Sequence, residues 1–123
     1  MIIVIEVVRI QVVIITRGEI LMAMDISIIK ESKNWWAQAE GLNTLLLMAD
    51  HFPNDPMQYF EKFKMMWKYI QTYLIDHEWG DWYEEGLDNS PEKRTALKGH
   101  IWKATYHQLR SLSNCVERLR KNE

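Results

Sequence analysis

The chain has 123 residues with a formal net charge of −2, and 47% of its residues are hydrophobic. These values are typical of one soluble globular domain and argue against a nucleic-acid partner, which favours a strongly basic surface. The single cysteine cannot form an intramolecular disulfide, and the sequence has no cysteine pair with the spacing of a structural zinc site. We therefore expect a cytoplasmic protein with no metal. Six tryptophans, five tyrosines and seven methionines exceed what packing a small domain needs, which favours a pocket or an interface.

The first 31 residues differ in composition from the rest of the chain. Residues 1–16 are almost all Ile and Val, a run that is too short to span a membrane and that contains Glu6 and Arg9. It also lacks the basic start and the cleavage site of a secretion signal, so neither a membrane partner nor secretion is expected. Its β-branched residues favour a strand buried on both faces, with a docked helix or a disordered segment as alternatives. We divide the chain into an N-terminal segment, 1–31, and a main unit, 32–123.

Two of the helices predicted in the main unit lie near its ends. Apolar residues at helical spacing predict a helix over 35–49, with polar capping candidates at 32–34 and an end near Pro53. A last helix is predicted from residue 101 or 102 to 118 or beyond, and its basic final turn complements the helix dipole.

Between them, Asn54-Asp55-Pro56 predicts the start of another helix. Asp55 is the expected N-cap, Pro56 occupies the first turn, and Gln58 completes a capping box. Two apolar stripes follow the helix as far as Leu74. A helix that is apolar on more than one side is expected to pack between two layers.

Aromatic rings and hydrogen-bonding groups alternate in three clusters, at 35–40, 78–83 and 101–107. Residues 76–83, which contain the second cluster, are predicted to form a loop, with a short strand pair around Gly80 as one possibility. Rings beside Gln, Glu, Lys and His suit a carbohydrate site, because sugars present C–H faces and a rim of hydroxyls. Packing at a helix start and a core or capping histidine are the competing interpretations. Phosphate-loop, His-Glu-x-x-His and Gly-x-Ser-x-Gly patterns are absent from the sequence.

Three motifs occur in a fixed order in the main unit. They are Trp-Trp-Ala-Gln-Ala-Glu at 35–40, Asp-His-Glu-Trp-Gly-Asp-Trp-Tyr at 76–83 and Trp-Lys-Ala-Thr-Tyr-His at 102–107. Together they resemble the C-terminal portion of the N-acylglucosamine 2-epimerase and cellobiose 2-epimerase superfamily, over about residues 33–120. The resemblance implies a mainly α fold, a partial (α/α)6 barrel of about three to four helices. We find no such resemblance in 1–31.

The resemblance also implies an activity. Members of this superfamily epimerise or isomerise a sugar at C2 by histidine acid/base proton transfer, without a cofactor. In this sequence the implied catalytic residue is His107, and the implied partner is a small-molecule mono- or disaccharide, an aldose or an N-acylhexosamine. Substrate-binding or supporting roles are implied for Trp36, Glu40, Trp102, Trp35 and Gln38.

The match to the superfamily is incomplete. Its partner histidine and its pocket arginine have no counterpart in 1–31, and a twelve-helix barrel needs upwards of about 200 residues. We therefore interpret the chain as an epimerase fragment that is inactive alone and self-associates through exposed aromatic and apolar side chains. In a second hypothesis, several chains oligomerise to complete a barrel and bind sugar. In a third, the chain is a small helical interaction module that binds a protein partner through its aromatic face.

Overall fold

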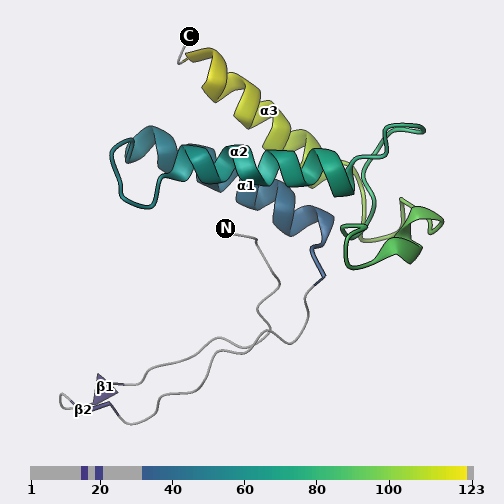
Figure 1. The fold of residues 1–123 in the computed structure, drawn as a ribbon, viewed down its shortest axis with the longest axis horizontal. Coiled ribbons are helices and arrows are strands. Elements are labelled where there is room, and N and C mark those ends of the chain that lie inside the picture. Colours follow the sequence, from purple (N-terminus) through teal and green to yellow (C-terminus); the bar gives the residue numbers. More distant parts are fainter. Residues whose placement is uncertain (1–14, 17–18, 21–31, 122–123) are drawn as a thin grey trace.

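The computed structural model describes residues 15–16, 19–20 and 32–121, and within these ranges the protein is mainly helical (Figure 1). It forms three α-helices: α1 (Trp35–His51), α2 (Tyr59–Tyr69) and α3 (Tyr106–Lys121). The shorter elements are the antiparallel pair β1 (Ile15–Thr16) and β2 (Glu19–Ile20), the π-helical turn η1 (Ile70–Leu74) and the 3-10 turn η2 (Pro91–Arg94). The remainder of the strand predicted near the N-terminus lies outside the described residues. Among those that are described, no helix is both long and apolar enough to cross a membrane.

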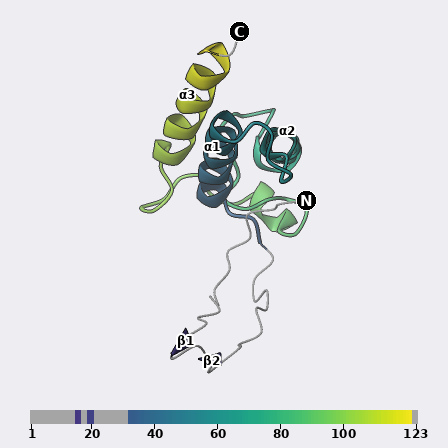
Figure 2. The same cartoon turned by 90° about the vertical axis from the view of Figure 1, so that its left-hand side faces the viewer.

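α1 is the central helix, with α2 on one side and α3 on the other (Figure 2). It begins and ends where the sequence predicted, and one of the predicted capping residues performs that role. The side chain of Asn34 accepts a hydrogen bond of 2.9 Å from the backbone N–H of Ala37. This bond satisfies one of the N–H groups that the first turn of a helix leaves without a partner.

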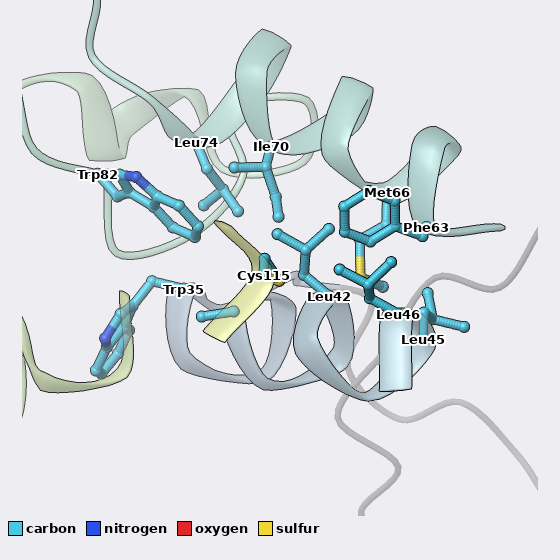
Figure 3. Packing of buried hydrophobic residues seen from close by; sticks show 11 residues of the cluster. Trp35, Leu42, Leu45, Leu46, Phe63, Met66, Ile70, Leu74, Trp82 and Cys115 are labelled. Atoms are coloured by element: carbon cyan, nitrogen blue, oxygen red, sulfur yellow. The ribbon is translucent and has the colours of Figure 1, made fainter. Parts of the chain in front are cut away.

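Large apolar side chains fill the interface between α1 and α2 (Figure 3). The buried residues that meet there are Leu42, Leu45, Leu46, Phe63, Met66, Ile70 and Leu74. Burying a side chain of this size stabilises a fold by about 1.5–3 kcal/mol. This interface is therefore the main hydrophobic core of the described residues.

The predicted capping box at the start of α2 is wrong. Asp55 instead closes a local turn, in which its Oδ1 accepts a hydrogen bond of 2.8 Å from the backbone N–H of Met57. Gln58 is the N-cap, with a left-handed φ of 51°, and its side chain makes no capping hydrogen bond. Because that conformation cannot continue a helix, α2 starts at Tyr59.

The prediction that this helix packs between two layers is also wrong within the described residues. One apolar face contacts α1, whereas Phe60, Met65 and Tyr73 are exposed. Neither predicted stripe is covered along its whole length, because Phe63 and Met66 are buried whereas Phe60 and Tyr73, from the same two stripes, are exposed.

α3 begins four or five residues later than predicted, at Tyr106. The preceding segment forms a turn in which the backbone N–H of Lys103 donates to the carbonyl of His100, at 3.1 Å. The Lys103 side chain is buried and lies 3.4 Å from Asp81 Oδ2. This inward ion pair, which local sequence cannot reveal, directs residues 100–105 away from a helical path.

The loop predicted over 76–83 is present. Ile75 and Trp82 form an antiparallel bridge across it, and Gly80 adopts a φ of 76°, which glycine tolerates best. Asp76 Oδ1 accepts hydrogen bonds from two backbone N–H groups of the loop. The loop is thus fixed by its own polar groups as well as by packing.

Candidate functional site

Three of the six predicted site residues lie together where α1 meets α3. Trp36 and Glu40 stand four residues apart on α1, so they share a helix face. His107, in the first turn of α3, places its Nδ1 2.8 Å from Oε1 of Glu40. The ring centroids of His107 and Trp36 are 6.1 Å apart, with the planes tilted by 43°. We refer to Trp36, Glu40 and His107 as the site cluster.

Small residues bring the two helices close enough for these contacts. Ala39 and Ser111 are completely buried, and the Ser111 hydroxyl donates a hydrogen bond to the Ala39 carbonyl. The distance between packed helices depends on the size of the side chains at their contact. Glu40 follows Ala39 directly, and His107 precedes Ser111 by one turn, so this close contact places both members of the pair.

Burial and charge act in opposite directions on Glu40. Burial raises the pKa of its carboxyl, but the hydrogen bonds from His107 and Arg110 and their positive charge outweigh that effect and lower the pKa. Glu40 is therefore ionised at neutral pH and can only accept hydrogen bonds. It follows that Nδ1 of His107 donates its proton to Glu40. In the neutral ring, Nε2 then carries the lone pair that can take up a proton.

Sequence reasoning missed two residues beside the site cluster, Arg110 and Tyr106. Nη2 of Arg110 donates to Oε1 of Glu40, and Nη1 donates to the Tyr106 hydroxyl at 3.0 Å. The guanidinium carbon lies 5.0 Å from the centroid of the Tyr106 ring. Helical spacing was the available signal, since Arg110 follows His107 by three residues and Tyr106 by four.

The other three predicted residues lie outside the site cluster. Trp35 and Gln38 are buried inside the fold, where they can support α1 but not meet a ligand directly in this arrangement. The Trp35 ring makes an edge contact with His100, at 6.1 Å between centroids. Trp102 lies in the segment before α3 and is 79% exposed. Substrate contacts by these three residues stay predictions.

The part of the chain that the structure describes contains no group of three or more His, Cys, Asp or Glu side chains able to hold a metal ion. The chemistry that the site cluster offers is proton transfer. A histidine whose tautomer is fixed by a carboxylate, beside an aromatic surface, can act as a general base or acid.

Comparisons with known proteins give a consistent result. The family model described as N-acylglucosamine 2-epimerase matches residues 12–111, a range that takes in part of the N-terminal segment as well as the three motifs. The cellobiose 2-epimerase of Ruminococcus albus is 30% identical over 92 residues, which cover 73% of this chain and 23% of that protein. The chain thus spans about a quarter of the length of the curated relatives it matches.

Solved structures agree on the fold. The cellobiose 2-epimerase of Spirochaeta thermophila matches with a TM-score of 0.61 at 28% identity, over 76% of this chain and 23% of that one. A sugar epimerase from a ruminal bacterium matches with a TM-score of 0.65 at 27% identity, over 84% and 26%. A D-mannose isomerase has the same fold, with a TM-score of 0.62 at 23% identity over 77% of this chain and 23% of that one. The predicted fold class, a mainly α part of an (α/α)6 barrel, is confirmed.

Proposed function

The chain belongs to the N-acylglucosamine 2-epimerase family, and we propose that it supplies one acid/base histidine, with its orienting carboxylate, to the site of a sugar 2-epimerase or isomerase. The observation that carries this proposal is the hydrogen bond of 2.8 Å between His107 Nδ1 and Glu40 Oε1. It joins residues that stand 67 positions apart and belong to two of the three recognised motifs.

The proposed chemistry acts on the open-chain form of an aldose or an N-acylhexosamine. Its C2 proton is acidic because it neighbours a carbonyl group, and its removal leaves the electron pair delocalised as an enediolate. Nε2 of His107 takes up or returns that proton, while ionised Glu40 stabilises the imidazolium that forms. Epimerisation returns the proton to the opposite face of C2, which requires a second acid/base group.

The neighbouring aromatic residues suit a sugar. The Trp36 ring is partly exposed beside His107 and offers a flat surface for a C–H face. Trp102 offers a second such ring, while Trp35 and Gln38 would hold the first turns of α1 in place. We expect the chain alone to be inactive, because it spans about a quarter of its relatives' length. We also expect it to self-associate, because Leu109 and Val116 of α3 are exposed.

A chimera tests the proposal in a complete barrel. Residues 33–120 would replace the matching segment of the Ruminococcus albus cellobiose 2-epimerase, and epimerisation would be followed by NMR of the sugar products. We expect turnover in the chimera, and a loss of about 10²- to 10⁴-fold with His107→Ala.

His51→Ala is the matched control, because that histidine lies exposed at the far end of α1. It should leave turnover unchanged. A chimera that folds and turns over equally well with alanine at 107 would refute the assignment of His107.

A further inference from the structure

We propose that Arg110 is a positioning residue, which holds the Glu40 carboxylate where it fixes His107 with Nε2 as the proton-transfer atom. This inference rests on the proposed function and deepens it. Its starting point is that two donors share one acceptor atom. His107 Nδ1 and Arg110 Nη2 both donate to Oε1 of Glu40.

Arg110 is itself held in place. Its Nη1 donates to the Tyr106 hydroxyl at 3.0 Å, and its guanidinium carbon lies 5.0 Å from the centroid of that ring. Tyr106 stands one turn earlier on the same helix. A planar guanidinium with donors in a fixed fork can bind both neighbours at once, whereas a lysine ammonium acts as a point charge on a flexible stem. The contact with Tyr106 therefore fixes the orientation of the Arg110 guanidinium, and with it the direction from which Arg110 donates to Glu40.

The Arg110–Glu40 pair is poorly suited to a mainly stabilising role. The side chain of Arg110 is 45% exposed and that of Glu40 is 26% exposed. Ion pairs in such surroundings contribute little to stability, because water screens them and both side chains lose freedom. The adjacent buried contact between Ser111 and Ala39 already joins the two helices. What Arg110 adds is the orientation of the carboxylate.

Loss of Arg110 has a defined chemical consequence. Glu40 would keep one hydrogen-bond donor and regain the rotamers of a long side chain. In water a neutral imidazole prefers the tautomer with its proton on Nε2. Once Glu40 no longer holds Nδ1–H, that proton would occupy the atom that has to accept one from the sugar. The His107 tautomer therefore reports on Arg110 directly, without any need for activity.

The imidazole nitrogen shifts of His107 test this in the 123-residue chain. The protein would be labelled with ¹⁵N and measured at a pH at which the two ring-nitrogen shifts themselves show the imidazole to be neutral. We expect the Nδ1–H tautomer in the unmodified chain and a shift toward Nε2–H in Arg110→Met. Arg110→Lys should give an intermediate result, because the charge remains but the fork does not.

Arg118→Met is the matched control. Arg118 also extends from α3 to α1, where it pairs with Asp50 at 3.1 Å and has an exposed fraction of 31%. This variant should leave the His107 tautomer unchanged, and circular dichroism should show all three variants folded. An unchanged tautomer in Arg110→Met would overturn the proposal. So would unfolding of Arg110→Met under conditions where Arg118→Met stays folded, because that would assign Arg110 a structural role.

The chimera separates this inference from the proposed function. If His107→Ala leaves turnover intact, the proposed function fails whatever the tautomer shows. If the tautomer does not respond to Arg110→Met, the inference about Arg110 fails while the role of His107 stands. When both hold, Arg110→Met in the chimera should lower kcat by at least about tenfold with little change in KM, as expected when an orienting group of a catalytic histidine is lost.

Discussion

The two interfaces of α1 are built from different kinds of side chain. Toward α2 the helix presents leucines, which pack against the large apolar residues of α2 and η1 (Figure 3). Toward α3 it presents Ala39, opposite an α3 face on which Gln108, Ser111 and Cys115 are buried. The first interface removes much more apolar surface from water, and the second brings the backbones closer together.

The difference indicates what each interface contributes. Apolar packing is strong but non-directional, so it stabilises the fold without fixing the exact rotation of a helix. Hydrogen bonds from a side chain of one helix to a group of the other, such as the bond from the Ser111 hydroxyl to the Ala39 carbonyl, restrict that rotation, because their geometry is narrow. The site cluster lies at the second interface, where side chains from two helices have to meet within hydrogen-bond distance.

The largest loss of stability is expected from a substitution in the interface between α1 and α2. Ile70 is completely buried, so Ile70→Ala should lower the free energy of unfolding by about 2–5 kcal/mol. Urea denaturation followed by circular dichroism measures this. Leu97→Ala is the control, because Leu97 is exposed and its truncation should cost less than about 0.5 kcal/mol. Equal losses in the two variants would mean that the α1–α2 contact is not the main core.

A smaller effect is expected from forcing the second interface apart. Ser111→Leu introduces a large side chain against Ala39 and should lower the free energy of unfolding by about 1–3 kcal/mol. It should also separate His107 from Glu40, and the ¹⁵N shifts of the His107 ring would report that. Ser111→Ala removes only a hydrogen bond, at about 1 kcal/mol, and should preserve the tautomer. A tautomer that survives Ser111→Leu would show that the close contact does not position the pair.

The smallest effect on stability at neutral pH is expected in the segment between η1 and α3, where Asp76 pairs with Lys98. The hydrogen bond from Lys98 lowers the pKa of Asp76 far below its usual value, against the opposing effect of burial and with help from two backbone N–H groups. A pKa that is depressed in the folded state adds stability above the ordinary aspartate pKa of about 3.9, and that stability is lost as the pH falls below it.

Urea denaturation between pH 7 and pH 3 tests the role of Asp76. The unmodified chain should lose stability below about pH 4. Asp76→Asn and Lys98→Met should each flatten that dependence, because each removes one partner of the ion pair. An acid profile that neither substitution alters would assign the loss of stability to other carboxylates.

The parts of the fold that were predictable depend on local sequence. The span of α1 and its cap at Asn34 follow from apolar periodicity and from a side chain that reaches only three residues ahead. The start of α2 was wrong because Asp55 forms a competing local turn before Gln58 reverses its φ. The start of α3 was wrong because Lys103 is held by Asp81, 22 residues away. No periodicity encodes such a tertiary contact.

The candidate site also has parts that local sequence could predict and parts that it could not. His107, Glu40 and Trp36 were named through resemblance to a family, because spacing along the chain cannot show that Glu40 and His107, 67 positions apart, meet. Arg110 was within reach of simple helical spacing and was overlooked, since no recognised motif contains it. Trp102 belongs to a motif, yet it lies outside the site cluster in this structure. A motif identifies candidate residues, whereas the packing of helices decides which of them meet.

The buried thiol at the second interface has a practical consequence. Cys115 is the single cysteine of the chain, and it lies in the core cluster with Leu42 (Figure 3). Burial raises its pKa, which reduces the share of reactive thiolate. A thiol reagent will therefore label the chain only during openings that expose α3. The rate of labelling therefore reports on openings that separate the helix that carries His107 from α1.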